Sequence, residues 1–123
     1  GCTATFTQYA GIEALTGPQD QAEAVVAEYQ RRRDVLVKGL NAIPGVSCRM
    51  PQGAFYTFPN VTSFGRPSAW IANYLIEEAG VATLPGDAFG DAGEGYLRLC
   101  FANSMENIER ALEQIADALG RLS

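Results

Sequence analysis

Residues 85–102 read PGDAFGDAGEGYLRLCFA, and this stretch decides the fold. Its first part, 85–95, is rich in glycine and acidic residues and is typical of a mobile loop, whereas 96–102 is a β-prone run that predicts a strand. Side chains alternate along a strand, so Leu97, Leu99 and Phe101 share one face. The other face carries Tyr96, Arg98 and Cys100. The pattern therefore predicts a strand with one apolar face and a guanidinium on the other.

Arg98 is the residue of this strand that most needs an explanation. A guanidinium stays charged in proteins, and its rigid fork of donors suits a carboxylate or a phosphate. The strand itself offers no acidic partner. Two interpretations remain: a structural ion pair with an acid of the preceding loop (Asp87, Asp91 or Glu94), or the binding of an external anion. Because buried ion pairs are not reliably stabilising, we favour the external anion.

The segments around this strand alternate between helical and extended patterns. Apolar spacing predicts helices over residues 7–15, 18–43 and 68–79, and a last helix that Asn103 caps with Glu106 as its partner. Further strands are expected over 55–58 and 81–84, and residues 46–49 are expected to form a short strand or an extended link. The fold class is α+β: a small mixed or antiparallel sheet of three to four strands covered by helices, including a long N-terminal helix and a C-terminal helix. At about 36 Å, the long helix could reach a neighbouring domain.

Apolar stripes predict which side chains of these elements face the core. Cys100 is expected to be buried. The stripe of the second helix consists of Ala22, Val25, Val26, Tyr29, Leu36, Leu40 and Ile43. That of the third helix consists of Trp70, Ile71, Tyr74 and Leu75.

Composition limits the classes of function. The 123 residues fit one domain, and the net charge of −5 argues against a nucleic-acid surface. No apolar run is long enough to span a membrane and no signal peptide is recognisable, so we expect a cytoplasmic protein. Three cysteines without a CxxC motif make a disulfide framework or a zinc site improbable. The chain has no histidine, which excludes catalytic relays that depend on an imidazole.

Three other features have ordinary structural explanations. Arg31, Arg32 and Arg33 form a basic run that we interpret as a solvated helix face, with Glu28 paired to Arg32. Lys38 could in principle form a Schiff base, but it lies on the polar side of the same helix. The glycines of 93–95 superficially resemble a dinucleotide-binding loop, yet they run into a strand rather than a helix, so we reject that interpretation.

Aromatic residues beside glycines are further site candidates. Phe55 and Tyr56 follow Gly53 in a short strand, where they either belong to the core or contribute one ring to a site. Phe89 lies between glycines in the loop. Because an exposed aromatic side chain is costly, Phe89 either lines a pocket or contacts a partner.

Three ordered motifs connect the chain to a known family. They are PQGAFYTFP at 51–59, PGDAFG at 85–90 and GEGYLR at 93–98, preceded by QYA at 8–10 and PQD at 18–20. Together they resemble the C-terminal small domain of class I (fold type I) pyridoxal-phosphate-dependent aminotransferases, with the nearest likeness to the aspartate-aminotransferase type. The resemblance extends over almost the whole chain.

The resemblance implies roles for individual residues. Arg98 matches the arginine that binds the α-carboxylate of the amino acid. Phe89, Tyr56 and Gly86 would line the pocket, and closure of the domain would bring Arg98 onto the substrate. The parent protein would be a homodimer that transfers an amino group from an amino acid, such as aspartate, to a 2-oxo acid, with pyridoxal 5′-phosphate as its cofactor.

The family's cofactor lysine and its other cofactor-binding residues belong to a large domain and have no counterpart here. We therefore expect residues 1–123 to be a substrate-clamping fragment, with 1–20 as the link from the large domain, that alone binds no cofactor and catalyses nothing. Two alternatives stay open: a stand-alone sensor of amino or keto acids, and the aminotransferase-like effector domain of a transcription regulator.

Overall fold

A small antiparallel sheet lies at the centre of the computed structural model, which describes residues 1–122. Its three strands are β1 (Tyr56–Thr57), β2 (Leu84–Pro85) and β3 (Leu97–Cys100), with β3 in the middle. Tyr56 pairs with Cys100, and Leu84 pairs with Arg98. The predicted α+β class is confirmed. Ser123, the last residue of the predicted domain, lies outside the described residues.

The strands are shorter than the sequence predicts. Backbone contacts nevertheless continue beyond the β1–β3 ladder: the Leu97 N–H donates to the Pro59 carbonyl (3.0 Å), and the Phe101 N–H donates to the Phe55 carbonyl (2.9 Å). Of the short strand or extended link expected over 46–49, the structure shows the link, with a single bridge between Ser47 and Asn60. Of the residues 81–84 expected to form a strand, only the last, Leu84, belongs to β2.

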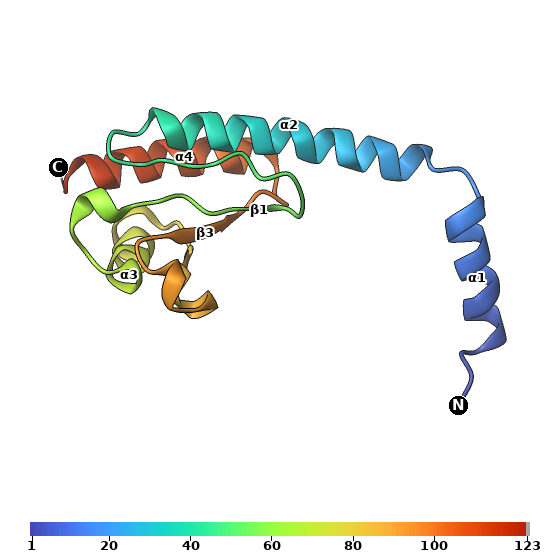
Figure 1. The fold of residues 1–123 in the computed structure, drawn as a ribbon. Coiled ribbons are helices and arrows are strands. Elements are labelled where there is room, and N and C mark those ends of the chain that lie inside the picture. Colours follow the sequence, from blue (N-terminus) through green and yellow to red (C-terminus); the bar gives the residue numbers. More distant parts are fainter. Residues whose placement is uncertain (123) are drawn as a thin grey trace.

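The described residues form four α-helices around this sheet. They are α1 (Thr5–Thr16), α2 (Asp20–Ala42), α3 (Ser68–Ala79) and α4 (Met105–Gly120). Figure 1 shows α2 and α4 side by side, and α1 standing apart at the far end of α2. The long second helix is confirmed, with 23 residues.

The cap of α4 lies one residue later than predicted. The Ser104 hydroxyl accepts the Asn107 N–H (3.2 Å), which makes Ser104 the N-cap. Asn103 supports it, because the Asn103 Oδ1 accepts both the Ser104 N–H (2.8 Å) and the Asn107 side-chain amide (2.9 Å). Either residue type can cap a helix, and the backbone path decides which one reaches the first free amide.

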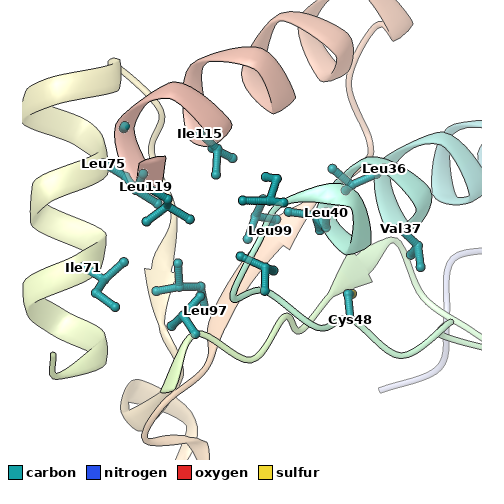
Figure 2. Close-up of a cluster of buried hydrophobic side chains, with 14 of the residues drawn as sticks. Leu36, Val37, Leu40, Cys48, Ile71, Leu75, Leu97, Leu99, Ile115 and Leu119 are labelled. Carbon is teal, nitrogen blue, oxygen red and sulfur yellow. The ribbon is translucent and has the colours of Figure 1, made fainter. Parts of the chain in front are cut away.

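The core lies between one face of the sheet and the helices α2, α3 and α4. Leu97 and Leu99 of β3 and Phe101 just beyond it are buried there, as their alternation predicts. Figure 2 shows Leu97 and Leu99 beside side chains from all three helices. These helical residues are Leu36, Leu40, Ile71, Leu75, Ile115 and Leu119. The opposite face of the sheet remains available for a site.

Several expected core residues are instead exposed. Cys100 is exposed because it shares the uncovered face of β3 with Arg98. Trp70 is 40% exposed, because Ile71 and Leu75 are the residues of α3 that face the core. Val25 and Val26 are also exposed, because the part of α2 that packs against the core begins at Tyr29 and the turns before it extend beyond the core.

Candidate functional site

Two aromatic rings flank the Arg98 guanidinium on the uncovered face of the sheet. The Arg98 Cζ lies 4.4 Å from the centroid of the Tyr56 ring and 4.2 Å from the centroid of the Phe89 ring. Both distances are within the range of a cation–π interaction. The three side chains come from β3, from β1 and from the 3₁₀ turn η2 (Gly86–Phe89) after β2. The fold thus brings together three of the four predicted site residues.

Arg98 has no acidic partner among residues 1–122. The four ion pairs of this part of the chain all belong to other arginines. Of the three loop acids considered as partners, Glu94 is instead engaged with the start of α3, where its carboxylate accepts the Ser68 N–H (2.9 Å). The half-buried guanidinium of Arg98 is therefore a cation that its surroundings do not neutralise.

Further rings pack behind both rings that contact Arg98. Phe55 lies 4.6 Å from Tyr56, centroid to centroid. Phe58 lies 6.4 Å from Phe89 in an edge-to-face arrangement, and Phe58 also stacks on Tyr96 at 5.3 Å. Such aromatic pairs add to the stability of the face they cover.

Gly86, the fourth predicted site residue, lies beneath this surface rather than on it. It is buried, and its N–H donates to the Tyr96 carbonyl (2.8 Å). A Cβ at Gly86 would collide with the Gly93 carbonyl oxygen, and a Cβ at Gly93 would collide with that of Gly86. In the structure, Gly86 allows a close backbone approach that holds the turn presenting Phe89.

A hollow of about 530 Å³ adjoins the two rings of Tyr56 and Phe58. Its other lining residues are Ser47, Arg49, Met50, Pro51, Asn60 and Tyr96. The alternation of the strand places Tyr96 on this face, but neither Tyr96 nor Phe58 was predicted as a site residue. A usable signal existed for Phe58: it lies two residues after Tyr56 in the same extended run, so both side chains point to one face.

The arginine run of α2 is a salt-bridged helix face, as predicted. Arg31 Nε lies 3.0 Å from the Glu28 carboxylate, and Arg32 Nε lies 2.7 Å from it. Hydrogen bonds from Arg31 and then Arg32 lower the pKa of Glu28 to about 2. Arg33 pairs with Asp34 at 2.8 Å. This cluster satisfies its own charges and is not the anion site.

Within residues 1–122, the structure contains neither a metal-binding cluster nor a membrane-spanning helix. No group of three or more histidine, cysteine, aspartate or glutamate side chains is arranged to hold a metal ion. None of the helices in this part of the chain is both long enough and apolar enough to cross a membrane.

Comparison with known proteins gives consistent matches. The profile of the family "Aminotransferase class I and II" matches residues 1–115. An aspartate aminotransferase from Pyrococcus horikoshii is 42% identical over 121 residues, covering 97% of this chain and 31% of that protein.

Solved structures agree with the sequence matches. A crystal structure of an aromatic aminotransferase from Pyrococcus horikoshii OT3 has a TM-score of 0.92 at 39% identity, covering 99% of this chain and 33% of that one. The aspartate aminotransferase from Rhizobium meliloti has a TM-score of 0.91 at 40% identity, covering 100% and 33%. The chain thus spans about a third of the length of these relatives.

Proposed function

The chain belongs to the class I and II aminotransferases, and from this membership we propose that Arg98 binds the α-carboxylate of the substrate in a transamination between an amino acid and a 2-oxo acid. The relatives include proteins named for aspartate and for aromatic amino acids. The matches therefore support the amino-acid class, with aspartate as one candidate substrate.

The observation that carries this proposal is a charged arginine with no acid among residues 1–122 to neutralise it. The rings of Tyr56 and Phe89 contact the guanidinium of Arg98, but they accept none of its N–H groups in ordinary hydrogen bonds. Its fork of donors is left for a ligand, and a carboxylate matches that fork with two parallel hydrogen bonds. Arg98 would thereby fix the substrate's orientation.

The cofactor would be bound by parts of the protein other than this chain. The family uses pyridoxal phosphate, which forms a Schiff base with a lysine. The amine of such a lysine is kept neutral by burial or by nearby cations. Lys38 is the only lysine of this chain, and its side chain is exposed on α2. The residues present therefore do not fit a cofactor site. We propose that the chain alone does not form the borohydride-sensitive absorbance band of such a Schiff base.

We further propose that residues 1–123 are the substrate-clamping domain and that 1–20 link it to a large domain in a homodimer. The exposed apolar side chains of α1 support a covering partner: none of its residues is buried, and Leu15 is 85% exposed. Apolar surface of this kind is normally covered by another part of the protein.

The test is a substitution of Arg98 in the complete aminotransferase polypeptide that carries this segment. Arg98→Lys keeps the charge but loses the fork, so kcat/KM for amino acids should fall roughly 10- to 100-fold. Arg66→Lys is the matched control, because Arg66 also lies over a ring, that of Trp70, at 5.1 Å. Unchanged kinetics of Arg98→Lys would contradict the proposal.

A further inference from the structure

We propose that Tyr56 and Phe89 form an aromatic clamp that fixes the Arg98 guanidinium in its binding orientation before the substrate arrives. They would act as positioning residues that work through Arg98. This inference rests on the function proposed for Arg98.

Contacts with two rings restrict the Arg98 side chain. A free arginine side chain samples many rotamers, and fixing it on binding costs conformational entropy. The Cζ of Arg98 has a ring centroid at 4.4 Å on β1 and another at 4.2 Å on the η2 turn. Contacts from two separate elements restrict the torsions of the guanidinium. Much of the ordering cost is then met during folding rather than during binding.

Aromatic rings hold the charged Arg98 side chain without occupying its N–H donors. A carboxylate could also hold an arginine in place, but it would occupy the N–H donors that the substrate needs. Aromatic faces stabilise the cation through their quadrupole and leave those donors free. The lack of any acid paired with Arg98 within residues 1–122 fits this arrangement. The clamp therefore stabilises Arg98 without competing with the ligand.

Neighbouring residues support the rings of Tyr56 and Phe89. Tyr56 belongs to the β1–β3 ladder and packs on Phe55 at 4.6 Å. Phe89 lies on a turn that the Gly86 N–H ties to the Tyr96 carbonyl, and Phe58 packs against its ring at 6.4 Å. Side chains that position another group are effective only when packing fixes their own rotamers. Each ring of the clamp has such support from one neighbouring ring.

The experiment is a mutant cycle in the complete aminotransferase polypeptide. Phe89→Leu and Tyr56→Leu should each raise KM for the amino acid about fivefold to tenfold, with a smaller change in kcat. Tyr56→Phe should raise KM less than Tyr56→Leu does, because it keeps the ring. In an Arg98→Gln background, Phe89→Leu should add less than about twofold, because the group on which it acts is gone.

Two controls separate positioning from folding. Trp70→Leu removes the ring beneath Arg66 and should leave KM unchanged. Phe89 is 51% exposed, so Phe89→Met, which keeps most of the volume but lacks the ring, should keep the melting temperature while raising KM as Phe89→Leu does.

The outcomes distinguish this proposal from the one it rests on. If Phe89→Leu costs as much in the Arg98→Gln background as in the wild type, the ring acts on the substrate directly and the clamp is refuted. If Arg98→Lys is impaired while both leucine variants behave as wild type, the clamp is again refuted but carboxylate binding stands. If Arg98→Lys has wild-type kinetics, the proposed function itself fails.

Discussion

The backbones of Gly86 and Gly93 touch beneath the turn that carries Phe89. Neither residue leaves room for a Cβ on the other, and in both cases the obstacle is backbone, which cannot move aside as a flexible side chain can. This contact joins the start of η2 to the end of the following turn, η3 (Asp91–Gly93). The position of one ring at Arg98 thus depends on two residues that have no side chain.

We expect Gly86→Ala to destabilise the fold by about 1–3 kcal/mol, the usual cost of forcing an extra methyl group into a packed site. Denaturant unfolding measures this change. Gly53→Ala is the matched control, because Gly53 is a loop glycine with open space where the Cβ would lie. Equal stability of the two variants would mean that the Gly86–Gly93 contact relaxes without cost.

Thr57→Val should stabilise the protein by about 1 kcal/mol. The Thr57 side chain is buried, and its hydroxyl has no hydrogen-bond partner among residues 1–122. Valine has nearly the same shape and removes the unsatisfied polar atom. The control is Thr16→Val, because the exposed Thr16 hydroxyl donates to the Ile12 carbonyl (2.8 Å). A loss of stability in Thr57→Val, measured by thermal unfolding, would contradict this prediction.

The sequence predicted the alternation of β3 and the exceptional position of Arg98, because a strand's period of two is a local property. It could not predict which rings meet Arg98. Tyr56 and Phe89 are separated by 32 intervening residues, and the register of β3 with β1 and β2 brings them together. Tyr56 and Phe89 could be selected individually as candidates, but not as a pair acting on one guanidinium.

The exposed side chains show a second limit of sequence reasoning. An apolar stripe gives the direction of a helix face, but the neighbouring elements decide where burial begins and ends. In α2 the apolar pattern includes Val25 and Val26, whereas packing against the core begins only at Tyr29. In the same way, Cys100 is apolar enough to be buried, yet it shares the face of β3 that carries Arg98 and is exposed.

The three cysteines should differ in their reactivity. Burial raises the pKa of the Cys48 thiol and also blocks access to it, so it should resist alkylation at neutral pH. Cys2 and Cys100 are exposed. Limited treatment with a maleimide followed by peptide mass spectrometry should find label on Cys2 and Cys100 before Cys48. Early modification of Cys48 in the folded protein would show that the segment after α2 opens readily.

Glu28 should make the long helix sensitive to acid. Its pKa is lowered to about 2 in the folded protein from an ordinary value of 4.5, chiefly by the hydrogen bonds from Arg31 and Arg32. A lowered folded-state pKa means that the carboxylate contributes stability above pH 4.5. That contribution is lost as the pH falls from 4.5 to about 2. Because the group is exposed, the effect is screened by salt.

A comparison of melting temperatures across this pH range tests the contribution of Glu28. Glu28→Gln should reduce the dependence of the melting temperature on pH between 4.5 and 2 at low salt. Glu113→Gln on α4 is the control, since Glu113 is exposed and takes part in none of the ion pairs within residues 1–122. If both variants keep the wild-type dependence, the Glu28–arginine pairs do not persist in solution, and the basic run is a solvated face without defined partners.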